Sequence, residues 1–117
     1  AIPQVKAGKA RALAVTGGKR AAALPDVPTV AETGIKGYEA TNWYGYVAPA
    51  DTPRPIIERL HKETVAILNM PDVREALLSR GIEAAPSSPA EFAAYIRAEN
   101  SKWSKVIKQS GIKGEAN

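Results

Sequence analysis

The chain contains no cysteine, which excludes disulfides, thiolate metal sites and cysteine nucleophiles. Aromatic residues are also scarce, at 6%, so a core must be built mainly from Ala, Val, Ile and Leu. No apolar run approaches the ~20 residues that a membrane span requires. No signal peptide is visible, and the opening on Ala1 without an initiator Met predicts a segment that starts within a fold, or a processed product.

Charged residues of both signs are distributed along the chain rather than concentrated in one part of it. The 16 basic and 12 acidic residues give a net charge of +4, and both signs are interspersed along the sequence. A basic surface can attract anions or nucleic acid, but interspersed charges are more typical of a solvated surface. The 117 residues, 44% of them hydrophobic, suit one small domain with a core.

Catalytic patterns are missing from the sequence. The single histidine, His61, has no accompanying nucleophile or second ligand, so we interpret it as a residue on a helix surface. Gly17 and Gly18 precede Lys19 and Arg20, but without the spacing of a P-loop. We interpret them as a turn, although such turns do occur where open α/β sheets bind ligands. No serine lies in a nucleophile elbow, and no carboxylate pair suggests a tuned acid and base. We therefore expect no enzymatic activity, no cofactor and no metal.

Helix signals occur at several places. Thr29 with Glu32, and Ser88 with Glu91, have the spacing of capping boxes. Prolines at first helical positions and glycines at helix ends complete the pattern. It predicts helices over residues 2–9, 29–33, 52–70, 71–80 and 88–110, and fraying of the tail at 113–117.

Short apolar runs between these helices predict β-strands. Residues 11–16 precede a glycine pair and are typical of a buried parallel strand. Residues 38–48 hold four of the seven aromatics, which favour extended structure, and residues 82–85 suit a third, short strand. Alternating helices and strands of this kind predict an α/β fold.

Five runs of residues also carry a family resemblance. They are residues 3–16 (PQVKAGKARALAVT), 24–34 (LPDVPTVAETG), 43–45 (WYG, followed by Ala48 and Pro49), 88–92 (SPAEF) and 103–107 (WSKVI). Together they resemble the receptors of tripartite tricarboxylate transporters, also called the Bug family. The resemblance runs the whole length of the chain, but covers only the last part of the longer family members.

The resemblance implies a bacterial periplasmic clamshell of two lobes, which closes on a small carboxylate and hands it to a membrane permease. On this basis residues 1–37 finish the second lobe, residues 38–50 cross between the lobes, and residues 51–117 complete the first lobe with a long final helix.

Four residues are candidate ligand contacts. Trp43 and Tyr44 offer apolar faces with hydrogen-bonding groups, and Gly45 would let a ligand approach the backbone amide. Thr16 would face the same cleft from the other lobe. The aromatic residues of this segment also suit plain packing in a core strand, and that alternative stays open.

Two other classes of function remain as alternatives. A small basic module that binds nucleic acid or a protein partner would show salt-dependent DNA binding. A receptor would instead show a thermal shift with dicarboxylates or tricarboxylates. An enzyme is the least favoured, since no catalytic constellation is present. We expect nucleic acid not to be a partner.

We expect the chain alone to self-associate, as a homodimer. A chain drawn from parts of two lobes leaves apolar faces and strand edges uncovered, and such surfaces associate. Light scattering as a function of concentration measures this, and a clean monomer at high concentration would contradict it.

Overall fold

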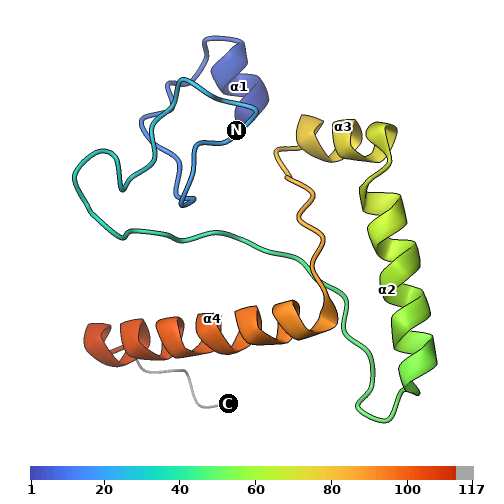
Figure 1. The fold of residues 1–117 in the computed structure, drawn as a ribbon. Coiled ribbons are helices and arrows are strands. Elements are labelled where there is room, and N and C mark those ends of the chain that lie inside the picture. Colours follow the sequence, from blue (N-terminus) through green and yellow to red (C-terminus); the bar gives the residue numbers. More distant parts are fainter. Residues whose placement is uncertain (113–117) are drawn as a thin grey trace. The chain divides into compact units, whose positions relative to one another are not determined.

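A computed structural model describes residues 1–112, and helices are its main regular elements (Figure 1). The described helices are α1 (Ile2–Lys6), α2 (Arg54–Leu68), α3 (Pro71–Ser79) and α4 (Pro89–Ser110). Two compact units divide the chain, Ala1–Ala85 and a second that begins at Pro86. This division leaves the two-lobe assignment as a prediction, and the expected fraying of 113–117 lies outside the described residues.

Local sequence signals account for the ends of α1, α2 and α3. The helix α1 ends at Lys6, three residues before the predicted end at residue 9, and Gly8 follows it with a φ of 70°, a conformation that only glycine adopts readily. The helix α2 has Pro53 at its N-cap, one residue later than the predicted Thr52. Pro71 opens α3, and Gly81, with a φ of 77°, follows its C-cap. The helices α2 and α3 contact each other within the first unit.

The long helix α4 is bounded by the signals that predicted it. The Ser88 hydroxyl accepts from the Glu91 backbone amide at 3.2 Å, and the Glu91 carboxylate accepts from the Ser88 amide at 2.8 Å. At the other end Gly111 is left-handed, with a φ of 64°. Within the helix the buried Glu99 carboxylate accepts from the Trp103 indole at 2.9 Å and pairs with Lys102. Lys102 thereby holds the Glu99 pKa below its usual value.

The β-strands predicted over 11–16, within 38–48 and over 82–85 are not formed in residues 1–112. The described pairing is one isolated parallel bridge between Val15 and Thr29. Its hydrogen bonds run from Val15 N–H to Pro28 C=O at 2.8 Å, and from Val30 N–H to Val15 C=O at 2.9 Å. A strand needs a neighbour that continues such a ladder, and the described residues supply none. The predicted α/β class is therefore not shown by this structure.

The short helix predicted at 29–33 is also not formed, although its capping box is. The Glu32 amide donates to the Thr29 hydroxyl at 3.1 Å, and the Thr29 amide donates to the Glu32 carboxylate at 2.7 Å. The segment forms turns instead, because Gly34 takes a φ of 120° directly after a single turn. A helix that is stopped after one turn cannot offset the cost of its nucleation.

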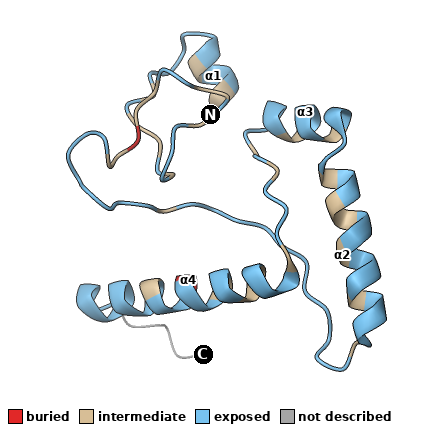
Figure 2. Ribbon diagram, in the orientation of Figure 1, coloured by how far each residue is buried: buried red, intermediate tan, exposed pale blue. Residues whose placement is uncertain are grey.

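Burial is shallow throughout residues 1–112 (Figure 2). No hydrophobic side chain there is fully buried, whereas Thr29 and Glu99 are 3% and 8% exposed. The helix α2 carries an apolar stripe that includes Ile56, Leu60 and Ile67, and these three side chains remain about half exposed. An apolar stripe of this kind normally faces a core, and the described residues do not cover it.

Candidate functional site

The turn that begins at Thr16 lies beside the start of the aromatic segment. The Ala40 amide donates to the Thr16 carbonyl at 2.9 Å. A Cβ added at Gly17 would lie 3.9 Å from the Thr41 hydroxyl oxygen, and one at Gly18 would lie 3.0 Å from a Glu39 carboxylate oxygen. Residues 16–18 and 39–41, more than 20 positions apart in sequence, are therefore neighbours.

The four candidate ligand contacts are all exposed. Trp43 is 41% and Tyr44 80% accessible, and Thr16 and Gly45 are exposed as well. The structure brings Thr16 to Ala40, three residues before Trp43. No interaction described for residues 1–112 joins Thr16 directly to Trp43, Tyr44 or Gly45, so their joint role in ligand binding stays a prediction.

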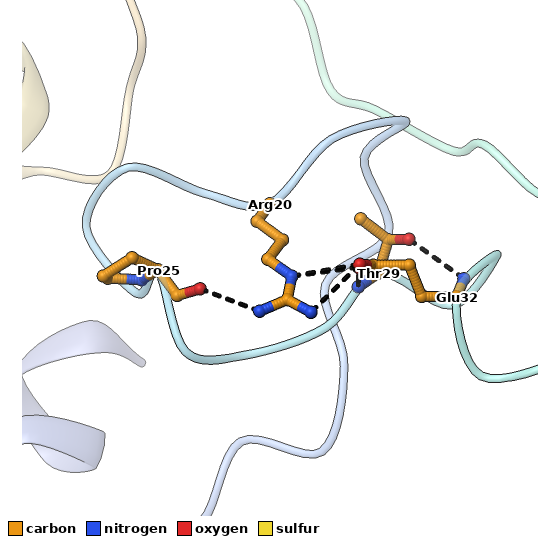
Figure 3. Close-up of polar contacts among 4 residues, drawn as sticks. All are labelled: Arg20, Pro25, Thr29 and Glu32. Atoms are coloured by element: carbon orange, nitrogen blue, oxygen red, sulfur yellow. Dashed lines mark hydrogen bonds and ion pairs between the residues drawn. The ribbon is translucent and has the colours of Figure 1, made fainter.

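A dense polar cluster fixes the loop that follows this turn (Figure 3). The Arg20 guanidinium donates to the Glu32 carboxylate from Nε and Nη2, with donor–acceptor distances of 3.0–3.1 Å. Its Nη1 donates to the Pro25 carbonyl at 3.2 Å. The same carboxylate accepts from the Thr29 amide. One side chain from each end of the loop thus ties residues 20–32 together, and we call these contacts the Arg20–Glu32 clamp.

The clamp shifts the pKa values of both partners. Hydrogen bonds from Arg20, and then from the Thr29 amide, lower the Glu32 pKa from its usual 4.5 to about 2. The Arg20 pKa is raised above its ordinary value by the same hydrogen bonds to Glu32. Both groups are therefore charged across the physiological range of pH.

A second carboxylate holds the same loop from the segment after α3. The Glu83 carboxylate accepts from the Ala22 amide at 3.1 Å and pairs with the Lys19 ammonium at 3.4 Å. The Ala22 amide, and then Lys19, hold the Glu83 pKa below its usual value. The two cations that suggested a phosphate loop in the sequence, Lys19 and Arg20, are thus both paired with carboxylates of the chain.

Sequence reasoning did not identify Glu32, Glu39 and Glu83 as neighbours of the candidate turn. Glu39 is the only acidic residue between positions 33 and 50, a signal that could have drawn attention to it. Glu83 lies 61 positions from Ala22, and no local spacing rule connects the two. An open hollow on α2 includes none of the candidate residues, being lined by Pro55, Ile56, Arg59, Leu60 and Glu63.

Residues 1–112 contain no group of three or more His, Asp or Glu side chains that could hold a metal ion. Among the helices described there, none combines the length and apolar character needed to cross a membrane.

Several curated proteins are similar to this chain. A protein of Pseudomonas sp. strain P51, described as a UPF0065 protein in the tcbD-tcbE intergenic region, is 41% identical over 88% of this chain and 31% of its own length. The protein BugT of Bordetella pertussis is 30% identical over 96% of this chain and 34% of its own. The chain thus spans about a third of the length of these relatives.

Solved structures similar to this chain point to the same group of proteins. The R. palustris protein Rpa4515, solved with adipate, superposes with a TM-score of 0.79 at 37% identity, over 94% of this chain and 37% of its own. The periplasmic binding protein BugD superposes with a TM-score of 0.80 at 34% identity, over 95% of this chain and 38% of its own. The chain therefore shares the fold of a part of known periplasmic binding proteins.

The family model described as "Tripartite tricarboxylate transporter family receptor" matches residues 1–112, which are the residues that the structure describes. This confirms the family resemblance drawn from the sequence motifs. The members of this family are binding receptors of the periplasm rather than enzymes. Since the match covers nearly the whole chain, the chain belongs to the tripartite tricarboxylate transporter receptor family.

Proposed function

We propose that this chain is part of a periplasmic receptor that captures a small carboxylate and delivers it to a membrane permease of the tripartite tricarboxylate type. The observation that carries the proposal is the family match over residues 1–112. The adipate with which the R. palustris protein was solved supports a carboxylate as ligand. The proposal assigns no catalytic role to any residue and favours neither the nucleic-acid nor the protein-binding alternative.

The proposed receptor closes as a clamshell, with residues 1–37 in the second lobe, 38–50 crossing between the lobes and 51–117 in the first. Clefts between domains are favoured ligand sites, and a ligand that contacts both sides stabilises the closed state. The bond between the Ala40 amide and the Thr16 carbonyl supports this assignment, because it joins a residue of the predicted second lobe to the crossover segment.

The proposed ligand site uses the hydroxyls of Thr16 and Tyr44, the Gly45 amide and the indole face of Trp43. Hydroxyl and amide groups can donate to carboxylate oxygens, and such charge-assisted hydrogen bonds are the strong ones. An indole offers an apolar wall beside them. Lys19 and Arg20 are not assigned to the ligand, because Glu83 and Glu32 already engage them.

Binding is tested on the protein expressed from its whole gene. Mono-, di- and tricarboxylates are titrated by calorimetry and by thermal shift, with DNA at two salt concentrations as the comparison. A ligand present at 100 times its Kd stabilises the protein by about 2.7 kcal/mol. Salt-dependent DNA binding without any carboxylate response would contradict the proposal.

Removing either candidate hydroxyl is expected to weaken carboxylate binding. Thr16→Val and Tyr44→Phe each delete one donor with little change in volume, so Kd should rise about fivefold to tenfold. Tyr46→Phe is the matched control, since Tyr46 is in the same segment, is 88% exposed and is not assigned to the site. Unchanged affinity in both variants, with the fold intact, would show that these side chains are structural.

A further inference from the structure

We infer that Glu39 is a specificity-determining residue, which selects a carboxylate that also carries an ammonium or another hydrogen-bond donor. The inference rests on the proposed function and deepens it by naming the class of ligand. That class is an amino-bearing carboxylate rather than a plain dicarboxylate.

The first observation is where the Glu39 carboxylate lies. It packs against the turn that follows Thr16: its Cδ is 3.1 Å, and its two oxygens are 3.0 and 3.4 Å, from the place that a Cβ at Gly18 would take. The next residue, Ala40, is tied to the Thr16 carbonyl at 2.9 Å. The backbone next to Glu39 is therefore fixed to the candidate turn, and its carboxylate, although exposed, lies against Gly18 of that turn.

The second observation is the charge balance of this turn. Lys19 pairs with Glu83 at 3.4 Å, and Arg20 pairs with Glu32 at 3.0 Å. Across residues 1–112, by contrast, no hydrogen bond or ion pair engages Glu39. The turn has two cations and three carboxylates around it, and Glu39 is the carboxylate without a partner among the described residues.

An unpaired carboxylate at this position discriminates between ligands by their charge. It repels a second carboxylate of the ligand and accepts hydrogen bonds from an ammonium group. It therefore favours the binding of amino-bearing carboxylates and disfavours the binding of dicarboxylates. Closure of a cleft around it removes water and strengthens both effects. The hydroxyls of Thr16 and Tyr44 remain free to hold the carboxylate that the two classes share.

The test compares ligands that differ only at one end. Succinate is paired with 4-aminobutanoate, glutarate with 5-aminopentanoate, and adipate with 6-aminohexanoate, each titrated by calorimetry into the protein expressed from its whole gene. For the pair with the best-binding member, we expect the amino acid to bind about tenfold tighter than the diacid.

Two variants isolate the Glu39 charge. Glu39→Gln should lower the preference for the amino acid about tenfold, because the amide neither attracts an ammonium nor repels a carboxylate. Gly18→Ala keeps the charge but places a Cβ 3.0 Å from the carboxylate, and should lower the preference by displacing it. Glu75→Gln, on the exposed surface of α3, is the control for net charge and should leave the preference unchanged.

The outcomes separate the inference from the proposed function. An amino-acid preference that falls with Glu39→Gln supports the inference. The inference is overturned if the wild type prefers the diacid, or if the ratio of the two Kd values in Glu39→Gln stays within about twofold of the wild-type ratio. Either result leaves the proposed carboxylate receptor intact. Failure of all six probes to bind overturns the inference, and failure of the mono-, di- and tricarboxylates as well removes the proposed function.

Discussion

Replacing Glu32 by Gln is expected to release the loop between residues 20 and 32. The carboxylate of Glu32 accepts from two nitrogens of Arg20 and from the Thr29 amide. Gln has one oxygen and no charge, so it can keep one of these bonds but not the bidentate pairing. We expect hydrogen exchange at the Thr29 amide to accelerate about tenfold. Glu63→Gln, on the exposed surface of α2, is the matched control and should leave this rate unchanged.

The Arg20–Glu32 clamp should make the stability of this loop depend on pH. The Glu32 pKa is about 2 in the folded loop, against its usual 4.5, so the clamp stabilises the loop fully above 4.5. This contribution is lost as the pH falls from about 4.5 to about 2, because the open loop then binds the proton more tightly. The Thr29 amide should therefore lose protection across this window in the wild type, and not in Glu32→Gln.

Arg20→Ala gives an independent check on the cause of the shift. Arg20 is the largest cause of the low Glu32 pKa, and the Thr29 amide is the next. Removing the guanidinium should raise the Glu32 pKa part of the way back, as followed by NMR titration of its carboxyl carbon. A wild-type Glu32 that titrates near 4.5 would show that the clamp does not form in solution.

The helices could be predicted from sequence because their signals are local. Proline at position 71, the capping box at Ser88 and the glycines after α1, α3 and α4 act within a few residues of the ends that they define. These features fix orphan amides or left-handed backbone positions wherever the rest of the chain lies. The predicted ends of α3 and α4 are accordingly confirmed to within one or two residues.

The strands could not be predicted in the same way. The run 11–16 has the composition of a buried strand, but a strand exists only through pairing with a neighbour, and composition does not say whether the neighbour is present. Among the described residues, only Val15 of this run forms a β-bridge, and its partner is Thr29. The relatives are about three times as long as this chain, and the extended segments that the family fold implies would need partners from beyond residues 1–112.

The candidate site was only partly accessible to sequence reasoning. The aromatic run at 43–46 and the family motifs directed attention to the segment, and the turn after Thr16 does lie beside its start. The surrounding charges were not foreseen, because Arg20 with Glu32 and Lys19 with Glu83 pair across 12 and 64 positions. Those pairings decide which charges remain for a ligand, and only the three-dimensional structure supplies them.

The second large effect is expected from Gly81→Ala, at the end of α3. Gly81 has a φ of 77°, which costs an L-residue about 1–2 kcal/mol. In addition, the new Cβ would lie 2.6 Å from Cδ1 of Ile2 in α1, so Ile2 must move. The two costs together should reduce the protection of the Ile82 amide, which donates to Leu77 C=O at 3.0 Å, by about 2–3 kcal/mol in hydrogen exchange.

Gly111→Ala separates the backbone cost from the steric one. Gly111 follows α4 with a φ of 64°, has nothing within 4 Å of an added Cβ, and precedes an equivalent bond from Ile112 N–H to Ile107 C=O. Its substitution should therefore show the backbone cost alone, about 1–2 kcal/mol. Combining Gly81→Ala with Ile2→Ala should remove the excess, because the methyl group then has room. If Gly81→Ala costs no more than Gly111→Ala, the predicted steric cost is wrong, and Cδ1 at the end of the Ile2 side chain moves aside freely.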